Sequence, residues 1–265
     1  MRVWPQGENN GFAPAVTAGV ASSSAECVAF INHDMRAPPS WLSELVAAYK
    51  PDDNVVCVAG QIRSWDGERV DFVEGVMNFY GMGDQVGYGK ALGEVDARDG
   101  QPLLFACGGS MLVSRHIYLT AGGFDPAFFA YFEDVDFGWR LWVMGYEVRF
   151  AEHAITYHRM HGTSSRFPEH QRTLLYERNG LRTIMKNYSD DQLSKVLAPA
   201  LLLLTKRAVT RGRLDLNRAA YSMGCDTEPT EQVSRASLAD LHTAYDLLLG
   251  LDDLLAERHR IQPAP

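Results

Sequence analysis

Two short apolar runs on either side of a helical pattern constrain the fold of this chain more than any other feature. Residues 26–31 (ECVAFI) and 55–62 (VVCVAGQI) carry almost no polar side chains, which is typical of strands buried on both faces of a sheet. Between them, residues 39–49 place apolar side chains three and four positions apart, the spacing of a helix. Strand, helix and strand joined by short connections indicate an α/β sheet.

The same alternation continues on both sides of this unit. Small residues predict a helix over 13–21, and an apolar stretch predicts a strand over 103–113. Helical spacing over 133–144 is followed by the period-two alternation of a strand over 147–157. Residues 64–101 are rich in Gly and Asp, and we interpret them as a long excursion outside the core.

The pattern changes about two-thirds of the way along the chain. Residues 168–211 show long helical stretches without a strand signal, and a last helix is predicted from Ser237, with Ser237 and Asp240 as a capping box. We therefore expect an α/β catalytic domain over residues 1–165 and a helical C-terminal extension over residues 166–265.

The charge balance argues against one class of partner. The net charge is −8, whereas proteins that bind nucleic acid usually present a basic face, so no nucleic-acid partner is expected. An acidic chain that binds a nucleotide diphosphate needs a metal ion or local basic groups to offset the repulsion. The four cysteines include no C-x-x-C pair, which favours free thiols and a cytoplasmic location.

One leucine-rich stretch raises the question of membrane contact. Residues 196–204 (VLAPALLLL) are far shorter than the roughly 20 residues that span a bilayer. Lys206, Arg207 and Arg211 follow them, so a peripheral contact with the inner face of the membrane is one interpretation. We favour the other, a helix that packs on the catalytic domain.

Three polar clusters are candidates for chemistry. The first, Asn32-His33-Asp34, follows the first apolar run, and ligands of α/β sheets bind beyond the carboxyl ends of strands. A carboxylate there can hold a hard divalent cation. The alternative is a plain turn before Pro38-Pro39.

The second cluster is Glu133, Asp134 and Asp136, directly after the aromatic run 128–132. One interpretation is structural: the helix dipole stabilises acids in the first turn of a helix, and Asp136 can pair with Arg140 four residues later. A partly apolar setting would instead raise the pKa of a carboxyl group and make it a usable general base.

The third cluster is His158 and His161, at the end of a predicted strand and before a Gly/Thr/Ser loop. Neutral imidazole binds several divalent metals. The alternative is a structural histidine.

In this order the segments resemble the inverting GT-A glycosyltransferases of family 2, in particular their bacterial rhamnosyltransferase-like branch. The resemblance covers residues 3–165, and a following helix is similar as well. The matching residues are Asn10-Gly11-Phe12-Ala13, Phe30-Ile31-Asn32-His33-Asp34, Pro39-x-Trp41-Leu42, Gly108-Gly109-Ser110-Met111-Leu112-Val113, Gly122-Gly123-Phe124-Asp125, Phe129-x-Tyr131-x-Glu133-Asp134-x-Asp136, His158, Gly162-Thr163-Ser164-Ser165 and Glu177-Arg178-Asn179.

The resemblance implies a GT-A type, Rossmann-like sheet that uses Mg²⁺ or Mn²⁺. The implied reaction moves a sugar from a nucleotide diphosphate donor to a glycan or lipid-linked acceptor, with inversion. Asp34 would be the last acid of the metal-binding D-x-D motif, with Asn32 in place of the first acid. His158 would close the metal site, with His161 as the alternative. Asp134 would be the catalytic base and Glu133 the alternative base.

The resemblance also implies a set of donor-binding residues. The glycines among them would let the backbone approach the donor closely. The donor-binding residues are Asn10, Gly11, Asn32, Asp34, Gly108, Gly109 and Asp136.

One departure from the family pattern sets up the competing hypotheses. The first nucleotide-binding strands of the family have no counterpart here, so the sheet is expected to be truncated at its N-terminal side, with exposed edges. We favour a start inside a longer gene; the alternatives are a partner chain that completes the site or an inactive chain. The rival functions are an inactive binding or scaffold module and a nucleotidyltransferase, and the last predicted helix could pair subunits in a homo-oligomer.

Overall fold

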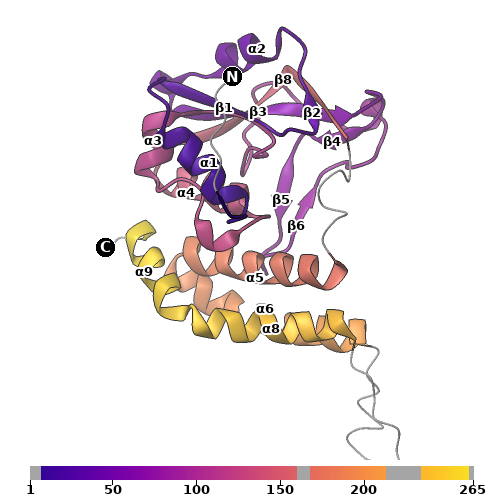
Figure 1. Ribbon diagram of the computed structural model, residues 1–265, viewed down its shortest axis with the longest axis vertical. Coiled ribbons are helices and arrows are strands. Elements are labelled where there is room, and N and C mark those ends of the chain that lie inside the picture. The colour runs from indigo at the N-terminus through magenta and orange to yellow at the C-terminus, as the bar shows by residue number, and fades with distance from the viewer. Residues whose placement is uncertain (1–6, 160–167, 213–233, 263–265) are drawn as a thin grey trace, which may run out of the picture.

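A mixed β-sheet with helices beside it lies above a second layer made of helices alone (Figure 1). This is the arrangement in the computed structural model, which describes residues 7–159, 168–212 and 234–262. The α/β class expected from the sequence is confirmed, and the described residues after Pro168 form helices.

The strands follow the chain in the order β1 (Cys27–Ile31), β2 (Met35–Arg36), β3 (Val55–Ser64), β4 (Val70–Phe72), β5 (Gly75–Met77), β6 (Gly83–Gln85), β7 (Ser110–Ser114) and β8 (Glu147–His158). The helices are α1 (Phe12–Ala21), α2 (Trp41–Ala48), α3 (Arg115–Thr120), α4 (Glu133–Val143), α5 (Glu169–Asn187), α6 (Asp190–Gly212), α8 (Arg235–Leu249) and α9 (Leu251–Ile261), with short 3₁₀ turns at Pro51–Asp53, Leu92–Glu94 and Pro126–Phe128.

The main sheet has the order β1-β7-β3-β8-β2, with β4 added on β3. β3 and β8 run parallel from the pair Val55 and Glu147 to the pair Ser64 and His158. β7 runs antiparallel to both of its neighbours, β1 and β3. β3 is buried along nearly its whole length, as its apolar run predicts. The carboxyl ends of β3 and β8 therefore meet at one edge of the sheet.

β1 is less buried than its apolar run predicts. Ala29 and Ile31 are exposed, so the expectation of a strand covered on both faces is wrong for this element. The reason is its position: β1 pairs with β7 on one side and, among the described residues, with no strand on the other. Among the described residues, β1 thus forms one edge of the main sheet.

Two further expectations about the middle of the chain are corrected. Residues 64–101 contribute to the core, because β4 pairs with β3 and Val70, Phe72 and Val73 are fully buried. In the stretch 103–113, the strand begins only at Ser110. The preceding residues form a loop against α4, where the backbone of Phe105 lies so close to Gly138 that no side chain would fit there.

The start of α8 differs from the predicted capping box. The hydroxyl of Ser234 caps the helix by accepting from the backbone N–H of Ser237. The hydroxyl of Ser237 donates to the carbonyl of Ala208 on α6, and Asp240 pairs with Arg211. Both side chains predicted to cap α8 therefore join it to α6 instead. None of the helices in the described part of the chain is long and apolar enough to cross a bilayer.

Candidate functional site

The loop of Gly108 and Gly109 touches two of the three polar clusters. The backbone N–H of Asn32 donates to the carbonyl of Gly109 at 3.2 Å. The backbone N–H of Gly108 donates to Asp134 Oδ2 at 3.0 Å. A Cβ on Gly109 would lie 2.6 Å from the end of the Met35 side chain and 3.0 Å from the amide of Asn32. A side chain on Gly109 would therefore require Met35 and Asn32 to shift. The loop brings the first two clusters together.

His158 brings the third cluster to the same place. It is the last residue of β8, where it pairs with Met35 of β2. Its Nε2 lies 3.5 Å from Asp34 Oδ1, and its Nδ1 lies 2.6 Å from Asp71 Oδ2. The sequence did not single out Asp71, which lies in the stretch that we assigned to an excursion. The sequence feature that could have identified Asp71 is its position as a lone acid between the apolar residues Val70 and Phe72.

The surroundings of His158 suit a metal ligand. Burial lowers the pKa of His158, but the hydrogen bond to Asp71 and the charges of Asp71 and Asp34 outweigh this and raise it. A carboxylate on one ring nitrogen is the usual means of orienting a histidine whose other nitrogen binds a metal. Asp34 and His158 therefore fit a divalent ion. Among the described residues no three His, Cys, Asp or Glu side chains form a complete metal site, so further ligands would come from elsewhere, such as donor phosphates.

Two arginines follow the candidate ligands closely in the chain: Arg36 comes two residues after Asp34, and Arg159 directly follows His158. The guanidinium groups of Arg36 and Arg159 each lie 4.7 Å from the ring centre of Trp65, and Arg36 also lies 4.5 Å from that of Tyr157. The backbone N–H of Arg159 donates to the carbonyl of Asp34 at 3.0 Å. Sequence reasoning missed this group, because the contact between Trp65 and the two arginines depends on the pairing of β3 with β8.

Glu133 and Asp134 begin α4 in a largely apolar setting. Glu133 is 6% exposed, and its Oε2 has no hydrogen-bond partner among the described residues. Asp134 keeps part of its surface exposed and accepts from the N–H groups of Gly108 and Val135. Burial and the charge of Asp134 raise the pKa of Glu133 to about 8, and burial raises the pKa of Asp134 despite its hydrogen bonds. The pair can therefore hold one proton near neutral pH.

The backbone before this pair is strained. Phe129, Tyr131 and Phe132 have φ angles of 62°, 68° and 69°, in the left-handed region that side chains rarely adopt. The buried amide nitrogen of Asn179 on α5 lies 3.0, 2.9 and 2.7 Å from the carbonyls of Phe128, Ala130 and Tyr131. Strained loops persist where surrounding contacts fix them, and this side chain supplies such contacts. We predicted a domain boundary between residues 165 and 166. That boundary lies between α5 and the strained loop, although Asn179 of α5 holds this loop in place.

The remaining predicted residues lie in different settings. Asp136 is fully buried and bonds to Arg140, Lys186 and Asn187. Burial raises its pKa, but the charges of Lys186 and Arg140 outweigh this and lower it. Its carboxylate is therefore taken up by internal partners, and the alternative of an ion pair with Arg140 is what the structure shows.

Gly11 and Asn10 lie at the start of α1. Gly11, with φ of 93°, packs against Phe129, and the N–H of Phe12 donates to the carbonyl of Phe129 at 2.7 Å. Asn10 is exposed beside it. This segment therefore reaches the strained loop directly. His161 and the loop 162–165 lie outside the described residues.

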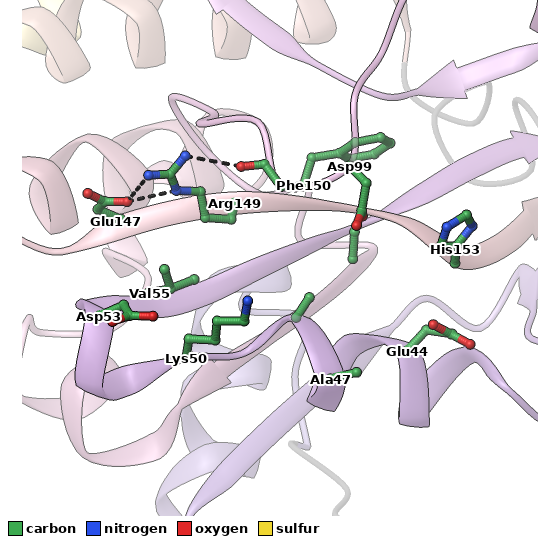
Figure 2. A pocket seen from close by; sticks show the side chains of 13 residues that line it. Glu44, Ala47, Lys50, Asp53, Val55, Asp99, Glu147, Arg149, Phe150 and His153 are labelled. Atoms are coloured by element: carbon green, nitrogen blue, oxygen red, sulfur yellow. Dashed lines mark hydrogen bonds and ion pairs between the residues drawn. The ribbon is translucent and has the colours of Figure 1, made fainter.

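Two cavities flank the sheet. An apolar groove of about 330 Å³ runs between α1 and β1 and ends at Asn32 and Gly108, so it adjoins the site. A cavity of about 390 Å³ lies beside the starting ends of β3 and β8 (Figure 2), whereas the site lies at their other ends. In that second cavity Arg149 is already paired with Glu147 and donates to the carbonyl of Gly100. We do not include it in the site.

The raised pKa of Glu133 predicts an unusual dependence of stability on pH. The carboxyl group titrates near 4.5 when unfolded and near 8 when folded, so the folded state holds a proton that the unfolded state has lost. Stability should therefore fall as pH rises from 4.5 to 8, by up to about 1.4 kcal/mol per pH unit. Glu133→Gln removes this loss, so its free energy of unfolding in urea should exceed that of the wild type increasingly toward pH 8. The exposed Glu8→Gln is the control; a constant difference across this range contradicts the prediction.

Comparisons with known proteins address the fold and the first half of the chain. The family model Glycosyl transferase family 2 matches residues 1–120. A glucosyl-dolichyl phosphate glucuronosyltransferase of Haloferax volcanii is 27% identical over 119 residues, which are 44% of this chain and 36% of that protein. The chain thus spans about a third of the curated relative that it matches. Asp134 and His158 lie beyond the matched family region.

One solved structure is similar in fold, and a second superposes less well. GalNAc-T7 with UDP, GalNAc and Mn²⁺ superposes with a TM-score of 0.52 at 12% identity, over 97% of this chain and 45% of that one. The mannosyltransferase PcManGT from Pyrobaculum calidifontis with GDP-Man and Mn²⁺ gives a TM-score of 0.44 at 12% identity, over 95% of this chain and 64% of that one. The fold is of the GT-A type.

Proposed function

We propose that this chain carries the catalytic centre of a metal-assisted glycosyltransferase. The observation that supports this most is the loop of Gly108 and Gly109, which bonds to the turn before Asp34 on one side and to Asp134 on the other. One end of the sheet thus combines candidate metal ligands with a candidate base. The family match over residues 1–120 and the GT-A fold favour the same function.

In this proposal Asp34 and His158 hold a divalent cation, Mn²⁺ or Mg²⁺, and Asp71 orients the imidazole. The cation, when bound, supplies positive charge to the leaving diphosphate. Arg36 and Arg159, which come two residues after Asp34 and one after His158, add positive charge in this proposal. Together they offset the repulsion between an acidic protein and an anionic donor.

The proposed donor site is the surface between the groove and the glycine loop. Gly108 and Gly109 have no side chains to keep a sugar from the backbone. Asn32 lines both this loop and the apolar groove beside β1. Asn10 and Gly11 border the strained loop and would contact the donor only from that side.

Asp134 is the proposed general base. Its carboxylate takes the proton of an acceptor hydroxyl as the oxygen attacks the anomeric carbon and the bond to the diphosphate breaks. Because no second carboxylate is assigned as nucleophile, the transfer proceeds in one displacement with inversion. Glu133 is the alternative base. The proposed acceptor is a glycan or a lipid-linked glycan.

Calorimetric titration of UDP-, GDP- and dTDP-sugars, with and without Mn²⁺, tests the proposal. At least one donor should bind, and binding should weaken at least tenfold without metal or in Asp34→Asn, because a charged ligand of the cation is lost. Asp52→Asn is the matched control: the same change on an exposed acid beside the starting end of β3.

The outcomes separate the proposal from its rivals. No binding of any donor to the folded chain, with or without metal, overturns the proposal for this chain and favours a scaffold module. Release of pyrophosphate on turnover instead of a nucleoside diphosphate identifies a nucleotidyltransferase.

A further inference from the structure

The helix α8 exposes a second apolar face in addition to the residues that it buries. Leu238, Leu241, Tyr245, Leu248 and Leu249 are between 50% and 69% exposed. They follow one another at spacings of three, four, three and one, so they lie on one face of the helix. We call these five residues the α8 face. A surface helix of a globular protein normally turns its apolar face toward the core. Because the α8 face is exposed instead, we expect a partner to cover it.

The inward side of α8 buries Ala239 and Leu247 together with polar groups that have specific partners. Ser237, Asp240 and Thr243 are at most 1% exposed. The hydroxyl of Ser237 donates to the carbonyl of Ala208 on α6, and Asp240 pairs with Arg211. These contacts fix the rotation of α8 on α5 and α6. The apolar face therefore cannot turn inward without breaking buried hydrogen bonds.

We propose that the α8 face is the contact surface of a homodimer, in which α8 pairs with α8 of a second copy in an antiparallel way. α8 itself lies along the lower edge of the helical layer (Figure 1). Nothing in the described part of the chain covers it. Pairing two such faces would bury on the order of 1,000 Å² in total, which reaches the size of a specific interface.

The spacing of the face is complementary to itself. A two-fold axis at the level of Thr243 places Leu238 against Leu248 of the second copy, because both are five residues from the axis. The same axis places Leu241 against Tyr245 of the second copy, two residues from it on either side. Each contact forms twice, as an isologous interface requires.

The charges at the two ends of the face favour the antiparallel arrangement. Arg235 is exposed at the start of α8, and Asp252 and Asp253 are exposed in the first turn of α9, directly after its end. Antiparallel pairing brings the arginine of one copy near the acids of the other, whereas parallel pairing places like charges together. The two acids also repel an anionic membrane, which makes a lipid surface the less favoured occupant.

Analytical ultracentrifugation over about a hundredfold range of concentration tests this proposal, since mass action should favour the dimer at the upper end. Leu241→Glu should abolish the dimer, because it places two like charges beside the axis. Leu42→Glu is the matched control, since Leu42 on α2 is 49% exposed and lies at the other end of the molecule. Thermal unfolding shows that both variants are folded.

A charge exchange tests the orientation. Arg235→Glu should weaken the dimer, and adding Asp252→Arg and Asp253→Arg to the same chain should restore it. A wild-type chain that is monomeric throughout, or a dimer unaffected by Leu241→Glu, overturns the proposal. A monomer that binds anionic vesicles, and loses this binding in Leu241→Glu, assigns the face to a membrane instead. If the dimer is not restored in the variant with all three exchanges, the antiparallel arrangement is excluded.

Discussion

Replacing Asp134 with Asn is expected to abolish sugar transfer while leaving donor binding intact. The amide cannot take the proton of an acceptor hydroxyl, and general bases contribute about 10²- to 10⁴-fold to rate. The fold of the site should survive, because the amide oxygen can still accept the N–H of Gly108, as Asp134 Oδ2 does at 3.0 Å. The measurement is turnover of the donor found by titration, together with its dissociation constant.

Glu133→Gln is the matched variant for this prediction. Glu133 is adjacent in sequence and more deeply buried than Asp134, so the same change of acid to amide is made one position away. It should reduce turnover far less than Asp134→Asn. Full turnover in Asp134→Asn would refute its role as base. Loss confined to Glu133→Gln would transfer that role to Glu133.

Replacing Asn179 with Ala is expected to destabilise the fold and the site together. The carbonyls of Phe128, Ala130 and Tyr131 share its amide group, and leaving buried acceptors unsatisfied costs about 1–3 kcal/mol each. Allowing for relaxation, the free energy of unfolding should fall by about 3 kcal/mol. Turnover should fall at least tenfold, because the strained loop positions Glu133 and Asp134.

Urea unfolding measures the first effect and donor turnover the second. Asn179→Asp separates hydrogen bonding from packing, since it keeps the size of the side chain but loses both N–H groups. It should be no more stable than Asn179→Ala. Gln192→Ala removes an amide from an exposed helical position on α6 and should change stability by at most about 0.5 kcal/mol. If Asn179→Ala also changes the free energy of unfolding by so little, the loop keeps its conformation without Asn179.

Local pattern was enough to predict several of the elements and the places where three polar clusters begin. Periodicity depends on which side of an element faces the core, and that information lies within about ten residues of chain. β3, α4 and β8 therefore begin and end within about two residues of their predicted bounds. The same information placed Asp34, Asp134 and His158 at the ends of elements. Their catalytic roles stay predictions.

The partners of these residues were decided by the tertiary structure. Asp71 reaches His158 from 87 positions away, because β4 and β8 both pair with β3. Asn179 reaches the strained loop from a helix that the sequence assigned to a separate extension. In each case the sequence of neither segment indicates that it contacts the other.

The surroundings of β1 and of Asp136 depend on the tertiary structure in the same way. β1 exposes Ala29 and Ile31 because it lies at the edge of the sheet. Asp136 is enclosed because Lys186 and Asn187 of α5 bond to it. A residue's neighbours within the chain determine its local conformation and the side that it presents. Which distant segment meets that side, and whether any does, depends on strand order and helix packing, and these are settled only when the whole sheet forms.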